Sequence, residues 1–164
     1  MSINRNLIIG FSIIVILAMS RLIPHPPNFT PILGMAFFAG AVFNKKVYAY
    51  LITVFAMLLR DLFLGFHAGM FVIYFSLSLC LLIGTYTSSR LSIITGIIGI
   101  SSGVLLFYLI TNLAVWYGSG IYTKNMSGLI ECYIMGLPFL QNTFFSSILY
   151  GMAALGLYQL ANKY

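Results

Sequence analysis

The stretch that decides the fold is residues 91–117, LSIITGIIGISSGVLLFYLITNLAVWY, a run without a charged side chain. A helix that crosses the hydrocarbon core of a bilayer needs about 20 mainly apolar residues. Residues 91–117 exceed that length, so they predict one membrane-spanning helix that is tilted or continues as a turn at the membrane surface.

The composition of the whole chain agrees with this interpretation. Of its 164 residues, 61% are hydrophobic and 6% are charged, against about 45–50% and about 25% in soluble proteins. Eight basic and two acidic residues are too few to cover a soluble surface, and disordered chains are polar rather than apolar. We therefore predict an integral membrane protein whose residues 1–164 form a single transmembrane domain.

Five further apolar segments lead us to predict an all-α, polytopic bundle of six transmembrane helices. The segments are residues 7–22, 31–43, 47–59, 70–86 and 137–160. The second and third are short, and merging into one hairpin is an alternative, but Lys45 and Lys46 between them favour a real exit from the membrane. Residues 18–20 also fit a signal-peptidase site; we favour a retained helix because Arg21 and Pro24 make a natural interfacial end. Pro138 is expected in the first turn of the last helix, where its missing N–H is harmless.

Basic residues are more frequent on one set of helix ends. With the N-terminus inside, the inner ends carry Arg5, Lys45, Lys46, Arg90 and Lys163, and the outer loops carry Arg21, Arg60 and Lys124. Both acids, Asp61 and Glu131, fall on the outer set. The positive-inside rule therefore predicts that both termini face the cytoplasm, across a cytoplasmic (inner) membrane. The cations are scattered rather than clustered, which argues against nucleic-acid binding.

The predicted outer loops are long, and the inner connections are short. Because long loops on a rigid scaffold commonly carry function, we expect a binding site that opens outward. In Pro24-His25-Pro26-Pro27 the prolines restrict the backbone, which suits a ligating histidine but equally a histidine that simply faces water. Arg60 and Asp61 either anchor a loop at a helix end or face a polar ligand, and His67 follows them.

Two further groups of residues are candidates for a site. Cys80 lies roughly 15 Å along the fourth helix at 1.5 Å per residue, where a lone cysteine is usually a small apolar residue and becomes a soft ligand only if a metal is supplied. Cys80 and Cys132 show no zinc-binding spacing. Aromatic side chains gather near the end of the fifth helix and could line a pocket for a flat ligand: Tyr108, Trp116, Tyr117, Tyr122 and Tyr133.

Other features are absent or allow two interpretations. The sequence has no phosphate-binding loop and no hydrolase motif. We place no acidic residue in the middle of a helix, which argues against an ion-coupled carrier. Small residues recur at Ala36 and Gly40, at Gly99 and Gly103, and at Gly151, Ala154 and Gly156. They would pack helices within the chain or against a partner.

Several motifs resemble a known family. They are RLIPHPPNFTP at residues 21–31, GMAFFAG at 34–40, DLFLGFH at 61–67, TNLAVW at 111–116 and GLPF at 136–139. Together they resemble the substrate-binding S components of energy-coupling factor (ECF) vitamin transporters, and most of all the cobalamin-specific BtuM type. The resemblance implies vitamin uptake, with cobalamin as the transported ligand and no cofactor of the chain's own. It also implies that an ECF coupling protein and ATPases supply the energy.

The resemblance also implies residue roles. His25 and Cys80 would be the axial ligands of the cobalamin cobalt, since imidazole and thiolate suit such a metal. The chain's one enzymatic role would be removal of the upper cobalt ligand, assisted by the Cys80 thiolate. The candidate substrate-binding residues are His25, Asn28, Arg60, Asp61, His67, Cys80, Trp116 and Tyr122.

Three alternatives stay open. The same fold could bind another small metabolite or a metal chelate, or the chain could be a structural or assembly protein of the membrane without a ligand. A membrane enzyme is the third, and no acid–base constellation supports it.

Overall fold

The structure is a computed structural model that describes residues 5–20, 24–43, 45–66 and 69–162, without the side chains of residues 59, 60, 63 and 64. In this part of the chain there are six α-helices, one short 3-10 helix and no strand, which confirms the all-α prediction. The helices are α1 (Arg5–Ser20), α2 (Ile32–Val42), α3 (Lys46–Leu64), α4 (Met70–Thr87), η1 (Ser88–Arg90), α5 (Ile93–Gly118) and α6 (Met126–Ala161).

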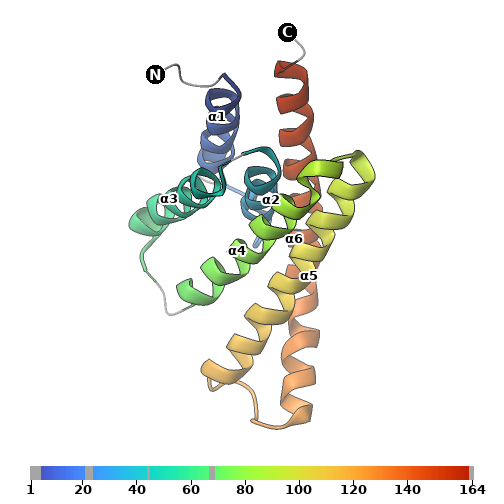
Figure 1. Ribbon diagram of the computed structural model, residues 1–164. Helices are drawn as coiled ribbons and strands as arrows, with labels where there is room; N and C mark the ends of the chain where they lie inside the picture. The colour runs from blue at the N-terminus through green and yellow to red at the C-terminus, as the bar shows by residue number, and fades with distance from the viewer. Residues whose placement is uncertain (1–4, 21–23, 44, 67–68, 163–164) are drawn as a thin grey trace.

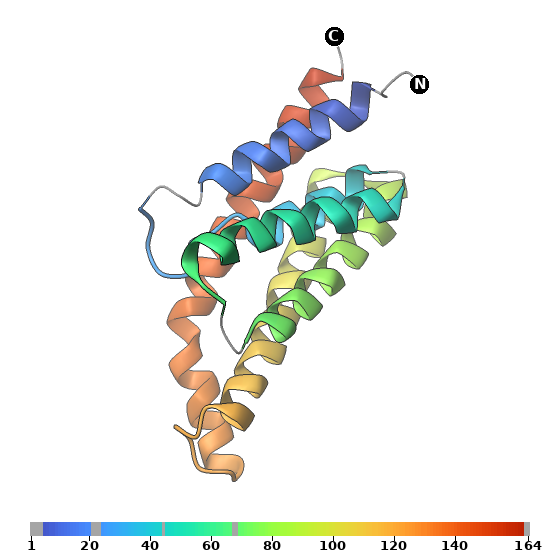
Figure 2. The same cartoon turned by 90° about the vertical axis from the view of Figure 1, so that its left-hand side faces the viewer.

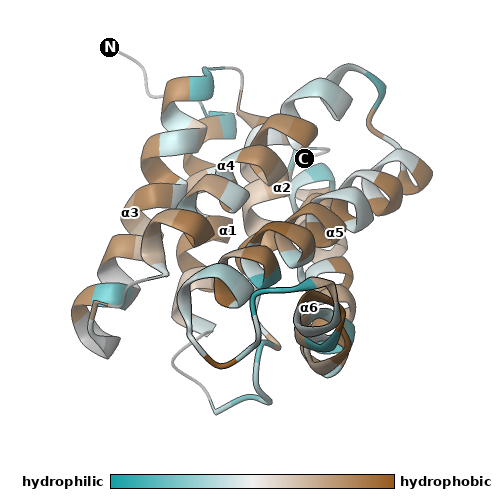
Figure 3. Cartoon of the chain, turned by 90° about the horizontal axis from the view of Figure 1, so that it is seen from below, coloured by the Kyte–Doolittle hydropathy of each residue, from teal (hydrophilic) through white to brown (hydrophobic). Residues whose placement is uncertain are grey.

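Three of these helical segments are long and apolar enough to cross a membrane. They are Met70–Arg90, Ile93–Gly118 and Met126–Ala161. The apolar helices Arg5–Ser20 and Ile32–Val42, and the apolar part Lys46–Leu58 of α3, are shorter. Large apolar side chains are exposed along the helices, and Figure 3 shows hydrophilic residues concentrated in the connecting segments. This distribution is the one expected where lipid replaces water around the helices.

The last helix is much longer than the predicted segment 137–160. It begins at Met126, where the Asn125 side chain accepts a hydrogen bond from the Gly128 N–H and caps the helix. Pro138 therefore lies inside α6 rather than in its first turn, and Glu131 and Cys132 are helical rather than part of a loop. Figure 2 shows that α6 bends along its length, and an internal proline is a usual cause of such a bend.

The third helix also extends beyond its predicted end at residue 59. It continues to Leu64 and ends at Gly65, whose φ of 90° suits glycine. Asp61 consequently lies within a helix and is only 1% exposed. The prediction that Arg60 and Asp61 end the third helix was wrong, because a carboxylate that finds a partner on a neighbouring helix can be buried within a helix.

The short helix α2 is the centre of the bundle, packed against α4, α5 and α6. Its backbone touches that of α4: a Cβ at Gly40 would collide with the Leu81 carbonyl, and one at Gly84 with the Phe37 carbonyl. The Phe37 ring and the Cys80 sulfur lie against Gly99 and Gly103 of α5. These small residues therefore pack helices within the chain, as small-residue faces do in membranes.

The connections lie alternately at the two ends of the bundle (Figures 1 and 2). Both ends of the chain lie at one end, together with the α2–α3 and α4–α5 connections; we call it the terminal end. The α1–α2, α3–α4 and α5–α6 connections lie toward the other end, which we call the loop end. This is the sorting of connections that the sequence predicted.

Candidate functional site

The loop between α1 and α2 forms a tight turn at the PHPPNFTP motif. The Phe29 N–H donates to the Pro26 carbonyl (3.0 Å), and Asn28 has a φ of 60°. Proline at the second position and a residue of positive φ at the third are the features of a type II turn, and asparagine tolerates that conformation well. The Pro26–Phe29 segment is therefore rigid by its own sequence.

This turn is held against α6. The Asn142 side chain donates from Nδ2 to the Pro27 carbonyl (3.0 Å), and the Phe29 ring meets the Tyr150 ring edge to face at 6.2 Å. The two contacts fix the loop over the groove between α5 and α6, with Asn28 as part of its wall.

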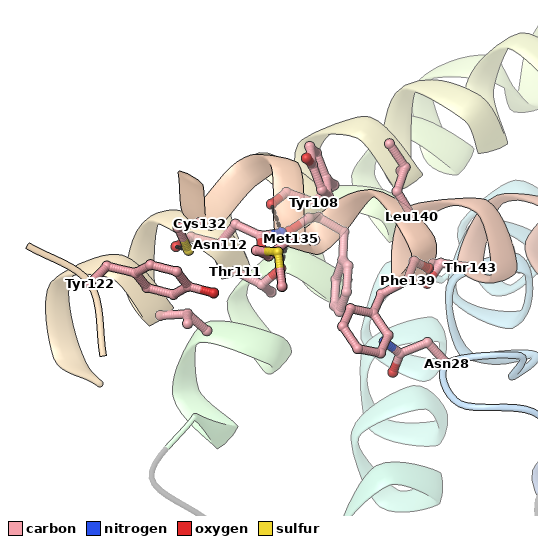
Figure 4. A pocket seen from close by; sticks show the side chains of 13 residues that line it. Asn28, Tyr108, Thr111, Asn112, Tyr122, Cys132, Met135, Phe139, Leu140 and Thr143 are labelled. Carbon is pink, nitrogen blue, oxygen red and sulfur yellow. Dashed lines mark hydrogen bonds between the residues drawn. The ribbon is translucent and has the colours of Figure 1, made fainter. Parts of the chain in front are cut away.

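A cavity of about 240 Å³ lies between this loop, α5 and α6 (Figure 4). Its lining residues come from four places: Asn28 in the α1–α2 loop; Phe107, Tyr108, Thr111, Asn112 and Val115 of α5; Tyr122 in the α5–α6 connection; and Cys132, Met135, Gly136, Phe139, Leu140 and Thr143 of α6. None of these side chains is charged. We call this space the solute cavity.

The hydroxyl groups that line the solute cavity can act mainly as hydrogen-bond acceptors for a ligand. The hydroxyls of Tyr108, Thr111 and Thr143 donate to the backbone carbonyls of Tyr133, Phe107 and Phe139 respectively. Their oxygens retain accepting capacity. The wall therefore favours an uncharged ligand that brings its own N–H or O–H groups.

Asn112 is the central polar group of the cavity, and its neighbours hold it in place. Its Nδ2 donates to the Tyr108 carbonyl (2.9 Å), and the Asn112 backbone carbonyl accepts a hydrogen bond from the Cys132 thiol (3.4 Å). Its Oδ1 lies over Gly136, where an added Cβ would come within 2.5 Å. Gly136 therefore makes room for the Asn112 amide, whose Oδ1 accepts no hydrogen bond from the described residues.

Two of the eight predicted site residues, Asn28 and Tyr122, line the solute cavity. Tyr108 of the predicted aromatic group lines it too, with Tyr133 packed behind it at a ring distance of 5.5 Å. Trp116 does not line it: its Nε1 donates to the Thr123 carbonyl, and its own carbonyl accepts from Lys124. It braces the α5–α6 connection instead.

The two predicted cobalt ligands lie in different surroundings. His25 is exposed, and its Nδ1 donates to the Pro26 carbonyl (3.0 Å). Because a carbonyl only accepts, this bond leaves the Nε2 lone pair available. Cys80 is fully buried, and its thiol donates to the Leu33 carbonyl (3.3 Å). Cys80 does not line the solute cavity, and the described residues contain no group of three His, Cys, Asp or Glu side chains suited to a metal ion.

The charged residues predicted near the site are only partly described. Asp61 lies between α3 and α4, where the Tyr74 hydroxyl donates to its Oδ2 at 2.5 Å, and it does not line the solute cavity. The side chain of Arg60, and His67 as a whole, lie outside the described residues.

Comparison with known proteins identifies the family. The whole chain, residues 1–164, matches a family described as a family of unknown function (DUF6580), and the protein belongs to it. No curated protein and no solved structure matches the chain.

Sequence reasoning missed most of the cavity wall. The missed residues are Phe107, Thr111, Asn112, Val115, Cys132, Met135, Gly136, Phe139, Leu140 and Thr143. A signal was present in α5, because 108, 111, 112 and 115 share one helical face. On α6 the corresponding face begins at Cys132, a position that the prediction had assigned outside the helix.

Proposed function

We propose that this protein is a membrane-embedded substrate-binding subunit for the uptake of a small vitamin-like solute, which it holds in the solute cavity. The observation that carries the proposal is an uncharged cavity at the loop end, with lone pairs on its polar groups and aromatic rings in its wall. Binding sites of this kind are mostly apolar, with a few placed polar groups that orient the ligand.

The size of the cavity limits the solute. A cavity of about 150 Å³ holds one benzene molecule, so the 240 Å³ of the solute cavity suit a molecule of one or two rings. Phe107, Phe139 and Tyr122 offer ring faces for stacking, and Asn112 offers an amide to N–H or O–H groups. An uncharged heterocycle with hydrogen-bond donors fits these demands best.

For the arrangement in the membrane, we propose six crossings with both termini in the cytoplasm. The described cations Arg5, Lys45, Lys46 and Arg90 lie in segments of the terminal end, in line with the positive-inside rule. The sequence has no nucleotide-binding motif, so ATP-driven uptake would need partners such as the ECF coupling protein and ATPases that the resemblance implies.

Cobalamin is the specific candidate that the resemblance adds. The free Nε2 of His25, held on a rigid loop, favours it as one cobalt ligand. A corrinoid ring is larger than the solute cavity, and coordination by Cys80 would require its thiol to leave the Leu33 carbonyl. Cobalamin binding through both residues would therefore be accompanied by movement of the loop away from α2 and α6.

The proposal is tested by identifying what the protein carries. Protein purified in detergent is denatured, and the released small molecules are compared by mass spectrometry between the wild type, Asn112→Leu and Gly136→Leu. We expect a ring-bearing solute with the wild type and about tenfold less with either variant, since a lost hydrogen bond to a positioned solute costs about 1–1.5 kcal/mol. Leu113→Ala is the matched control, because Leu113 faces outward and is 48% exposed.

Cobalamin binding is tested in a separate experiment. Protein from cells fed cobalamin is examined by absorption spectroscopy, with His25→Ala and Cys80→Ala beside the wild type. A corrinoid spectrum that shifts in both variants supports coordination by both residues, and a spectrum that shifts only in His25→Ala removes Cys80 as a ligand. If folded wild-type protein carries no solute and binds no added cobalamin, the substrate-binding function is rejected in favour of a structural role.

A further inference from the structure

Two smaller spaces continue inward from the solute cavity. A middle cavity of about 100 Å³ is lined by Asn28, Phe107 and Thr143, which the solute cavity shares, and by Met57 and Ile73 among others. A third void of about 10 Å³ lies between α3 and α4, and it shares Met57 with the middle cavity. The three spaces thus form a series in which each space shares lining residues with the next.

Thr53 gives the third void a polar character that packing alone does not explain. Its side chain lines the void and is 3% exposed, and its Oγ1 has no hydrogen-bond partner among the described residues. A buried hydroxyl without a partner is unfavourable, and a void of about 10–15 Å³ is enough for one water molecule. Ser78, on the facing wall of the same void, supplies a second polar group. The geometry therefore suits a water molecule between α3 and α4.

Met57 is the side chain that separates the third void from the middle cavity. It is buried, at 2% exposure, and it lines both spaces. An unbranched thioether changes rotamer easily and fills irregular gaps. Tyr50, Thr53, Met57 and Asp61 follow one another at intervals of three and four residues, so they share one face of α3. That face carries the polar groups that a hydrated route would need.

The arrangement of the two helices allows this interface to open. In Figure 2, α3 and α4 separate toward their connecting loop. Near that loop, the bond from the Tyr74 hydroxyl to Asp61 links the two helices. A small displacement of α3 would join the spaces without breaking any helix.

We propose that the α3–α4 interface is an aqueous release route from the solute cavity toward the terminal end, with Met57 as the gate between the cavity and the route. The proposal rests on the proposed substrate-binding function for its biological purpose. The route itself is a property of the helices and is tested without any solute.

The test measures thiol reactivity at Thr53→Cys with a charged, membrane-impermeant methanethiosulfonate, applied to intact cells and to inverted membrane vesicles. The readout is the rate of thiol modification of T53C compared with that of the wild-type protein. The wild-type rate should be low because both native cysteines are buried. Val54→Cys is the matched control, since Val54 is the neighbouring residue on the outer side of α3 and is 36% exposed. We expect T53C to react about tenfold faster than V54C in inverted vesicles, because a thiol surrounded by hydrocarbon is scarcely ionised and only the thiolate reacts.

The gate is tested in the same chain. Adding Met57→Ala to T53C should let the reagent reach the thiol from intact cells as well, whereas adding Leu58→Ala should not, because Leu58 is an outward residue at 38% exposure. If T53C reacts no faster than V54C from either side, or if Met57→Ala has no more effect than Leu58→Ala, the route is refuted. Absence of a copurified solute would reject the proposed function and leave the reactivity result unchanged, so the two failures are distinguishable.

Discussion

At the scale of single residues, Asp61 shows how a buried carboxylate is accommodated in a bundle of apolar helices. Its side chain is 1% exposed, and removing a carboxylate from water is costly unless other groups replace the lost hydrogen bonds. The Tyr74 hydroxyl does so at 2.5 Å from the next helix. Acidic residues inside membrane helices are rare and mark functional positions by default, and this one adjoins the proposed release route.

Tyr74→Phe should destabilise the protein by about 1.5–3 kcal/mol, the range for a hydrogen bond to a charged group. The measurement is thermal or chemical unfolding of the purified protein in detergent. Tyr86→Phe serves as the control, because Tyr86 lies on the same helix and is 83% exposed. Equal effects of the two substitutions would mean that the Asp61–Tyr74 bond contributes nothing measurable to stability.

At the scale of the elements, α2 is only 11 residues long and still organises the bundle. All eight residues from Leu33 to Gly40 are buried, because α4, α5 and α6 surround the helix. Close approach depends on missing side chains: Gly40 and Gly84 let the α2 and α4 backbones touch. Such contacts gain dispersion energy at short range, which is the main attraction between helices in lipid.

Gly84→Leu should therefore prevent α2 and α4 from meeting. We expect a loss of at least about 1–3 kcal/mol, as for overpacked cores, seen as a lower unfolding midpoint and a lower yield of monodisperse protein. Gly156→Leu is the same change at a helical glycine with open space around it, and it should be neutral. A stable G84L protein would show that the α2–α4 contact is not needed for folding.

At the scale of the whole molecule, the alternation of the connections separates two ends with different composition. The terminal end carries most of the described basic residues. The loop end carries the proline-rich turn, and the solute cavity lies there. This polarity agrees with a protein that receives a solute on one side of the membrane and releases it on the other.

The topology is tested with two exposed positions. Lys45→Cys lies at the α2–α3 connection and Gly118→Cys at the end of α5. With both termini in the cytoplasm, an impermeant thiol reagent should label K45C only in inverted vesicles and G118C only in intact cells. Labelling of both from the same side would exclude the six-crossing arrangement.

Much of the fold is readable from local sequence. The predicted segment 91–117 corresponds to α5 (Ile93–Gly118) and 70–86 to α4 (Met70–Thr87), because each is a long apolar run with polar residues at its ends. The end of α3 was misplaced because Arg60 and Asp61 were taken to end the helix, and the start of α6 because Pro138 was taken to lie in its first turn. Asp61 and Glu131 continue these helices instead, one paired with Tyr74 and the other exposed on the surface of α6.

The sequence by itself determined that this chain is all-α, with helices long and apolar enough to cross a membrane, alternating connections and a rigid Pro26–Phe29 turn. Apolar run length, charge placement and proline chemistry act locally. Only the tertiary structure decided the site. It brought Asn28 into the same cavity wall as Asn112 and Gly136, buried Cys80 against Gly103, and paired Asp61 with Tyr74. These contacts join residues far apart in the chain, and their geometry follows from how closely the helix backbones approach, which no local pattern specifies.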